Sequence, residues 1–279
     1  VGFAVAGQTG SLVPADKKLY ALRNATATVD SIPLICSSIM SKKLATGADG
    51  IVLDVKVGDG AFMKNEQDAE KLADAMVRVA RLAGKKCSAI ITDMSKPLGL
   101  AVGNSLEVIE AVEALKGNAP ADLYEVSIAL AAEMLYLAGK GTSEECRAMA
   151  EEALHSGRAL EKLREMIAEQ GGDPNVIDDY SLFAQPKRSK EVYADRDGFI
   201  SGISCEKTGL VSLSLGAGRA TKEADIDFSA GIKFAHTVGD KVKKGDLIAT
   251  LYTSTDCDIE AAASEISAVF SYSDSFEPS

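Results

Sequence analysis

Residues that commonly bind metals or form disulfides are scarce in this 279-residue sequence. It has two histidines, His155 and His236, and no HExxH motif, so we do not expect a zinc enzyme. Its five cysteines are scattered, and no two of them form a CxxC pair. Isolated thiols are typical of a reducing compartment rather than of a disulfide framework, so the cysteine pattern predicts a cytoplasmic protein.

Positive charge is also in short supply. The 30 lysines and arginines face 41 aspartates and glutamates, which gives a net charge of −11 and a pI near 4.8. Nucleic-acid-binding proteins present a basic face, so this balance argues against a nucleic acid partner. The sequence has no run of about 18 apolar residues, the length that a membrane-spanning helix requires. It shows no signal-peptide pattern either. We therefore expect neither membrane nor nucleic acid among its partners.

The sequence does contain an alternation of strands and helices. Branched apolar residues predict strands at 51–57 and 86–92, and an amphipathic pattern predicts a helix at 66–82 between them. This order predicts an α/β fold with a mostly parallel sheet flanked by helices. Loops at the carboxyl ends of such strands usually carry the site, and here those loops are 58–63 and 93–103.

The last third of the chain has a different texture. Residues 181–190 lack periodicity and predict a linker, and short strand patterns separated by glycine turns follow it. The stretch 239–249 resembles the hairpin of biotinyl- and lipoyl-type barrel-sandwich domains, but without their Met-Lys-Met attachment site. The predicted organisation is a partial catalytic α/β domain at 1–180, with part of a helical domain at about 12–45, and a C-terminal α+β barrel-sandwich-like module at 191–279.

The most informative segment covers residues 8–43. It places Arg23 before a Thr-Val-Asp-Ser-Ile-Pro turn, and it places Ser38 and Lys42 four residues apart on one face of the next predicted helix. A guanidinium, a hydroxyl and an ammonium that converge can bind a planar ring with carbonyl oxygens and an N–H, such as a pyrimidine. The spacing alone also fits a surface arginine, a surface lysine and a solvated serine, and by itself it favours this plainer interpretation.

Three motifs and the C-terminal β module together resemble one enzyme family. The motifs are QTGSLVPADKKLYALRNATATVDSIPLICSSIMSKK, GADGIVLDVKVGDGAFMK and TDMSKPLGLAVGNSLEVIEA. They resemble the pyrimidine-nucleoside and thymidine phosphorylases over essentially the whole chain. The resemblance implies that Arg23, Ser38 and Lys42 are the catalytic, base-holding residues and that Phe62 lines the base pocket.

The reaction that the resemblance implies is phosphorolysis of uridine- or thymidine-type nucleosides. Inorganic phosphate is the co-substrate, and the products are the free base and (deoxy)ribose 1-phosphate. The base leaves with negative charge developing on its ring. Arg23 and Lys42 would donate hydrogen bonds to its carbonyl oxygens, while Ser38 would orient its N3 edge. Donors that bind the departing anion more strongly than the substrate accelerate such a reaction.

The resemblance further implies a potassium-like cation and a homodimer in the full-length protein. The matching ligands are the backbone carbonyls of Leu98 and Ala101 and the carboxylate of Glu110. Ligands that are all oxygen suit a hard cation. Without the resemblance, a glutamate near Glu107 on a predicted helix is more simply a surface carboxylate.

One expected element of the family is not found in the sequence. The glycine-rich phosphate-binding stretch, of the type Lys-x-Ser-Thr-Gly-Gly-Val-Gly-Asp, is absent, as is the histidine that accompanies it. The sequence also begins directly with an apolar run at 1–6, which predicts a strand with nothing before it. We therefore expect the central and C-terminal portion of a phosphorylase, whether a fragment or a truncated product, with its activity in isolation left open.

Two other functions compete with this interpretation. A phosphoribosyltransferase of the anthranilate type shares the architecture, but it requires a diphosphate-binding glycine loop and magnesium-binding carboxylates, and neither pattern is found. A non-catalytic, base-binding remnant of the same fold would bind uracil or thymine without phosphate-dependent turnover. The sequence leaves the preference between uridine and thymidine open.

Overall fold

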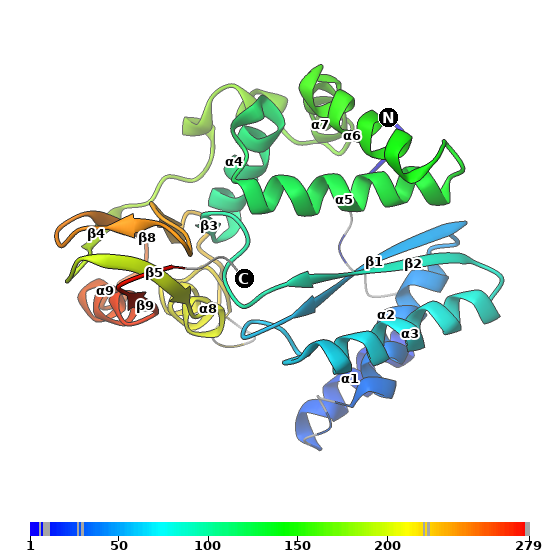
Figure 1. The fold of residues 1–279 in the computed structure, drawn as a ribbon, viewed down its shortest axis with the longest axis horizontal. Coiled ribbons are helices and arrows are strands. Elements are labelled where there is room, and N and C mark those ends of the chain that lie inside the picture. The colour runs from blue at the N-terminus through cyan, green and yellow to red at the C-terminus, as the bar shows by residue number, and fades with distance from the viewer. Residues whose placement is uncertain are drawn as a thin grey trace. The chain divides into compact units, whose positions relative to one another are not determined.

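The computed structural model describes residues 1–5, 7, 12–26, 28, 31–219, 221 and 224–276 (Figure 1). The chain forms two compact units. Unit 1 comprises residues 1–58, 62–93 and 125–153, and unit 2 comprises residues 59–61, 94–124 and 154–279. Within the described ranges, no helix has both the length and the apolar character needed to cross a membrane.

Unit 1 is built around a strand–helix–strand motif. Strands β1 (Gly50–Val57) and β2 (Lys86–Asp93) pair in parallel, from Gly50 opposite Lys86 to Val57 opposite Asp93. Helix α3 (Glu66–Leu82) connects them and packs against both (Figure 1). The N-terminal end of α3 is capped by the side chain of Asn65, which accepts a hydrogen bond from the backbone N–H of Asp68. The predicted α/β alternation and parallel pairing are confirmed here.

The core of unit 1 follows from two periodicities. Along β1, alternate residues Ile51, Leu53 and Val55 are buried. Along α3, the buried residues recur every three or four positions and form one face: Ala69, Leu72, Ala73, Met76 and Ala80. Helix α2 adds Ile35 and Met40 to the same core. Burial of each large side chain contributes about 1.5–3 kcal/mol, so α2 is held firmly by its apolar face.

Two helices precede this motif. Helix α1 (Pro14–Ala25) and helix α2 (Ile32–Ala45) both have proline in the first turn, where its missing N–H costs no hydrogen bond. The predicted helix that carries Ser38 and Lys42 is confirmed as α2. The predicted strand at 1–6 is wrong for residues 1–5, which form no strand and whose side chains are exposed, while residue 6 lies outside the described residues. An apolar run becomes a strand only when a neighbouring strand pairs with it, and none does so among the described residues.

Five helical segments follow β2 with short connections. They are α4 (Asn104–Glu113), the π-helical turn η1 (Ala114–Asn118), α5 (Ala121–Leu137), α6 (Ser143–His155) and α7 (Arg158–Glu169). The ammonium of Lys86 donates to the carbonyl of Leu137 at 3.0 Å, so the end of α5 lies beside the start of β2. Two 3₁₀ turns, η2 (Pro174–Ile177) and η3 (Tyr180–Leu182), follow α7.

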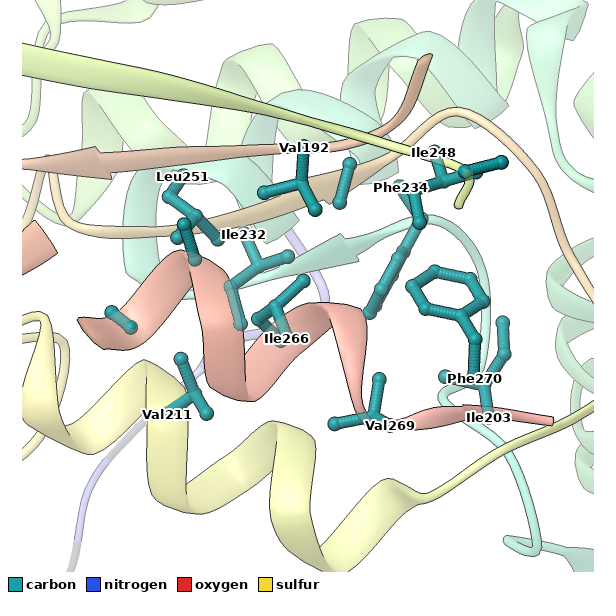
Figure 2. Packing of buried hydrophobic residues seen from close by; sticks show 14 of the residues in the cluster. Val192, Ile203, Val211, Ile232, Phe234, Ile248, Leu251, Ile266, Val269 and Phe270 are labelled. Carbon is teal, nitrogen blue, oxygen red and sulfur yellow. The ribbon is translucent and has the colours of Figure 1, made fainter. Parts of the chain in front are cut away.

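Unit 2 contains two antiparallel sheets. The strand order of one is β3-β6-β8-β4 and that of the other is β7-β5-β9. Their bounds are β3 Ala101–Val102, β4 Arg188–Tyr193, β5 Gly198–Ile203, β6 Gly231–Phe234, β7 Lys241–Val242, β8 Leu247–Thr253 and β9 Phe270–Ser273. Strand β4 therefore begins inside the segment that the sequence predicts as a linker. Figure 2 shows Val211 of α8 (Cys205–Ser214) and Ile266 of α9 (Ile259–Ser267) packing with Ile232 and Leu251 of the sheet.

The C-terminal region has the predicted mixture of helices and strands, but the described residues form two open sheets and no closed barrel. The edge strand β3 comes from residues 101–102, far upstream of the predicted module. It pairs with β6, and the N–H of Phe234 donates to the carbonyl of Leu100 at 2.7 Å. The hairpin resemblance concerned residues close in sequence, so it could not reveal this distant partner.

Candidate functional site

A polar cluster joins α1 to α2 in unit 1. The Nζ atom of Lys42 lies 2.6 Å from Oδ2 of Asp16 and 2.9 Å from Oγ of Ser38. Ser38 and Lys42 are four residues apart on α2, so their side chains leave the same helix face. Asp16 and Arg23 are seven residues apart on α1, which also places them on one face. The cluster formed by Asp16, Arg23, Ser38 and Lys42 is called the α1–α2 cluster below.

The cluster is largely shielded from solvent. Arg23 and Ser38 are each 6% exposed, and the side chain of Asp16 is 11% exposed. The side chain of Lys42 is 29% exposed, so it is the most solvent-accessible side chain of the cluster. The Arg23 guanidinium donates to the carbonyl of Leu34 at 3.5 Å and lies over the ring of Tyr20, 5.2 Å from its centroid.

Asp16 is ionised at neutral pH. Burial by itself would raise the pKa of its carboxyl. Hydrogen bonds from Lys42 and Ser38 oppose that effect, as do the positive charges of Lys42 and Arg23, and the resulting pKa lies below its ordinary value. One carboxylate therefore interacts with all three residues that the sequence singles out as holding the base.

Asp16 is the residue of this cluster that sequence reasoning missed. One signal was present, because an aspartate seven residues before Arg23 lies on the same face of any helix that spans both. Its contact with residues 22 and 26 positions later, however, depends on how α1 packs against α2.

Phe62 lies apart from the helical segments, on the loop that follows β1. Its side chain is 57% exposed, and the next residue, Met63, forms a bridge with Val57 and is buried. An aromatic ring with this much exposed surface is available for stacking on a planar ligand. Its role in a base pocket stays a prediction.

A second polar group that the sequence did not suggest lies on the β1–β2 pair. Lys56 Nζ lies 2.8 Å from Asp54 Oδ2 and 2.9 Å from Thr92 Oγ1, and Thr92 also donates to Asp54. Asp54 and Lys56 occupy positions of β1 that alternate with the core residues, so they lie on the opposite sheet face. The alternation in the LDVKV segment was the available signal.

The predicted cation ligands belong to the loop between β2 and α4 in unit 2 and to α4 itself. The N–H of Leu100 donates to Oε1 of Glu110 at 2.7 Å, and the N–H of Ala101 also bonds its carboxylate. Burial is the main reason that the pKa of Glu110 lies above its ordinary value. These two N–H bonds lower it, whereas the negative charges of Asp122 and Glu107 raise it further.

The predicted ligands at this loop, backbone carbonyls and a carboxylate, would suit a hard cation in their chemistry, and the carboxylate has acidic neighbours. Gly99 packs directly on Glu110. A Cβ atom at position 99 would lie 2.9 Å from Cδ of Glu110 and closer still to Oε2. Across the described ranges, no group of three or more histidines, cysteines, aspartates or glutamates is arranged to hold a metal.

A hollow of about 430 Å³ lies elsewhere in unit 1, between α3 and β2. Its lining residues are Glu70, Ala73, Asp74, Val77, Arg81, Cys87, Ser88, Ala89 and Ile91. None of the predicted site residues is among them. The α1–α2 cluster is therefore recognised by its hydrogen bonds and charges, and this hollow is a separate feature.

Comparison with known proteins identifies the family. Residues 1–160 match the glycosyl transferase family a/b domain, and residues 199–273 match the pyrimidine nucleoside phosphorylase C-terminal domain. The chain belongs to the pyrimidine-nucleoside phosphorylase family. The resemblance seen in the sequence motifs is thereby confirmed.

Curated relatives carry the same name. The chain is 52% identical over 254 residues to the pyrimidine-nucleoside phosphorylase of Bacillus subtilis and 53% identical to that of Geobacillus stearothermophilus. Each alignment covers 91% of this chain and 59% of the relative. The Staphylococcus aureus enzyme is 52% identical over 252 residues, which is 90% of this chain and 58% of the relative. The chain thus spans about three-fifths of the length of these relatives.

Proposed function

We propose that this chain forms the base-binding part of a pyrimidine-nucleoside phosphorylase. Arg23, Ser38 and Lys42 hold the pyrimidine, and Phe62 lines its pocket. The observation that carries the proposal is the α1–α2 cluster, in which an ammonium and a hydroxyl meet at 2.9 Å beside a shared carboxylate. The names of relatives that are 52–53% identical support the same activity.

The chemistry of the proposed reaction requires stabilisation of a leaving group. A phosphate oxygen forms a bond to C1′ of the sugar while the bond from C1′ to the base nitrogen breaks, and the base keeps the electron pair. The Lys42 ammonium and the Arg23 guanidinium can donate to the carbonyl oxygens on which that charge collects. Loss of one such donor typically raises a barrier by about 3–4 kcal/mol. We assign no residue of this chain to phosphate.

We also propose that a potassium-like cation binds at the loop before α4. The carbonyl oxygens of Leu98 and Ala101 and the carboxylate of Glu110 would hold it. The negative charges of Glu107 and Asp122 near this carboxylate support the choice of a cation. Such an ion would supply local charge compensation. The homodimer and the cytoplasmic location stay predictions.

Calorimetric titration of uracil and thymine into the chain tests the base site. The test variants are Arg23→Ala and Lys42→Ala. The matched control is Lys43→Ala, because Lys43 is the next cation along α2 and its side chain is exposed. We expect both test variants to weaken binding at least about tenfold, since a hydrogen bond to a charged group contributes about 1.5–3 kcal/mol. The control should match the unmutated chain.

Two results would count against the proposal. If the unmutated chain binds neither base, it does not hold a base site. If Lys43→Ala weakens binding as much as Lys42→Ala, a general loss of positive charge explains the effect and the cluster is not the site.

A further inference from the structure

The proton arrangement of the α1–α2 cluster can be worked out from its contacts. An ammonium only donates hydrogen bonds, a carboxylate only accepts them, and a serine hydroxyl has a single proton to donate. Lys42 donates to Ser38 Oγ at 2.9 Å, so the Ser38 oxygen is an acceptor in that contact. Asp16 Oδ2 and Ser38 Oγ lie 2.6 and 2.9 Å from the same Lys42 ammonium, and a hydrogen bond from the Ser38 hydroxyl lowers the pKa of Asp16. Because the carboxylate cannot donate, the proton in that contact belongs to Ser38.

This arrangement determines what Ser38 can offer to a ligand. Its proton is directed to Asp16 and one lone pair is used by Lys42, which leaves one lone pair of the hydroxyl. Lys42 donates to Asp16 and Ser38 and therefore keeps a third N–H. The cluster thus presents a hydrogen-bond acceptor beside a donor. The edge of uracil and thymine presents a ring N–H between two carbonyl oxygens, whereas cytosine has an unprotonated N3 at that place.

We propose that Asp16 is a positioning residue for base recognition: it directs the Ser38 hydroxyl proton away from the ligand, so that Ser38 accepts the ring N–H of uracil or thymine and cannot donate to N3 of cytosine. The inference rests on the proposed function, because it assigns a role within the same base site. Asp16 acts through Ser38 and Lys42 and touches no reacting atom itself.

A purely structural role for Asp16 makes a different prediction. The ion pair between Asp16 and Lys42 also connects α1 to α2. If that connection were its whole role, removal of the carboxylate would loosen the site and weaken the binding of uracil and of cytosine by the same factor. The ratio of the two dissociation constants therefore separates the two roles.

The experiment measures dissociation constants for uracil and cytosine by calorimetry. The variants are Asp16→Ala, Asp16→Asn, Ser38→Ala and the double variant Asp16→Ala with Ser38→Ala. Asp74→Asn is the matched control, because Asp74 is an exposed carboxylate on α3. Circular dichroism confirms that each variant is folded.

We expect Asp16→Ala to lower the preference for uracil over cytosine by about tenfold or more, because the Ser38 proton becomes free to face N3. Asp16→Asn should lower it less, since the amide oxygen still accepts a hydrogen bond from Ser38. In the Ser38→Ala background, Asp16→Ala should leave that preference unchanged, since the hydroxyl through which it acts is gone. Asp74→Asn should behave like the unmutated chain. The inference would be overturned if Asp16→Ala weakened the binding of uracil and cytosine by the same factor, or if its shift of the preference were undiminished in the Ser38→Ala background.

A ligand-free measurement keeps this test separate from that of the proposed function. Carbon-13 NMR titration of the Asp16 carboxyl in the unmutated chain and in Ser38→Ala reports the hydrogen bond directly. We expect a higher Asp16 pKa in Ser38→Ala, because a bond to the charged form is lost. An unchanged pKa would overturn the inference even if uracil binds. A chain that binds neither base would overturn the proposed function, and the role assigned to Asp16 with it.

Discussion

Asp16 in unit 1 and Glu110 in unit 2 are both partly shielded carboxylates, yet their surroundings move their pKa values in opposite directions. Burial raises the pKa of each. At Asp16, hydrogen bonds from Lys42 and Ser38 outweigh that effect. At Glu110, two backbone N–H groups do not outweigh it, and the charges of Asp122 and Glu107 add to it. A nearby cation in the form of lysine therefore stabilises the ionised form in a way that two backbone dipoles do not.

The comparison also bears on function. Asp16 already has its cation within the protein. Its surroundings therefore favour a fixed arrangement of side chains that can form hydrogen bonds with a neutral ligand. Glu110 lies among acidic neighbours without a described lysine or arginine partner of its own, so the proposed cation from solution would compensate its charge. The two regions would thus serve different ligands because their compensating charges come from different sources.

The largest expected effect comes from crowding the Glu110 carboxylate. In Gly99→Ala, the new Cβ would lie 2.9 Å from Cδ of Glu110 and closer still to Oε2, at a residue with φ of +72°. We expect a loss of about 2–4 kcal/mol in the free energy of unfolding, from backbone strain together with displacement of a hydrogen-bonded carboxylate. Urea-induced unfolding measures it.

The control for this prediction is Gly84→Ala. Gly84 has nearly the same backbone conformation, with φ of +73°, but a Cβ added there would meet no atom within 4 Å. It should cost only about 1–2 kcal/mol, the strain of the left-handed conformation. Equal losses in the two variants would show that the contact with Glu110 has no cost of its own.

The next largest effect concerns the cation of the α1–α2 cluster. Lys42→Ala removes the partner of a carboxylate that is 11% exposed. Because the lysine itself is 29% exposed, the loss falls below that of a fully buried pair, and we expect about 1–2 kcal/mol in the free energy of unfolding. Lys43→Ala should stay within about 0.5 kcal/mol of the unmutated chain. Similar losses of unfolding free energy in Lys42→Ala and Lys43→Ala would show that the pair with Asp16 contributes no more than an ordinary surface charge.

A smaller effect is a difference in pH dependence. The pKa of Asp16 is lowered, so its contribution to stability is present above its unfolded value of about 3.8 and is lost as pH falls through the folded value. Asp16→Asn should therefore be most destabilising near pH 7 and lose that effect below about pH 4. Unfolding free energies of the two proteins across pH 3–7 measure this trend.

Glu110 should show the opposite sign. Its pKa is raised above the ordinary value of 4.5, so ionisation disfavours the folded state as pH rises from 4.5 through the folded value. Relative to the unmutated chain, Glu110→Gln should therefore have a more favourable free energy of unfolding at pH 7 than at pH 4. If both variants show the same sign of pH dependence, the contrast between the two carboxylates is incorrect.

The smallest expected effect is that of a monovalent cation. Potassium present at its dissociation constant would stabilise the folded chain by about 0.4 kcal/mol. Thermal unfolding in potassium chloride and in choline chloride at equal ionic strength measures the difference. We expect Glu110→Gln to abolish it and Asp16→Asn to leave it intact. A potassium effect that survives in Glu110→Gln would exclude Glu110 as a ligand.

Local patterns predicted most of the elements of unit 1. The bounds of α3 match the sequence prediction, because amphipathic spacing and a capping residue act within one or two helical turns. The strand prediction for the apolar run at 1–6 was wrong for residues 1–5 because it depended on a contact outside the local sequence. A strand depends on a partner, and the run carries no information about one.

The candidate site was predictable in part. The placement of Ser38 and Lys42 on one helix face followed from their spacing, and the family resemblance singled out Arg23. Asp16 was not predictable in this way, because its bond to Lys42 joins residues 26 positions apart on two helices. The pairing of β3 with β6 was hidden for the same reason, since 130 residues separate Ala101 from Gly231.

The sequence by itself therefore determined the α/β character of the chain, the faces of its main helices and its membership of a family of phosphorylases. Periodicity, caps and motifs encode these properties over short stretches. Only the tertiary structure decided that a carboxylate of α1 meets the serine and lysine of α2, and which strands share a sheet. Such contacts depend on the packing of whole elements, whose geometry no local pattern specifies.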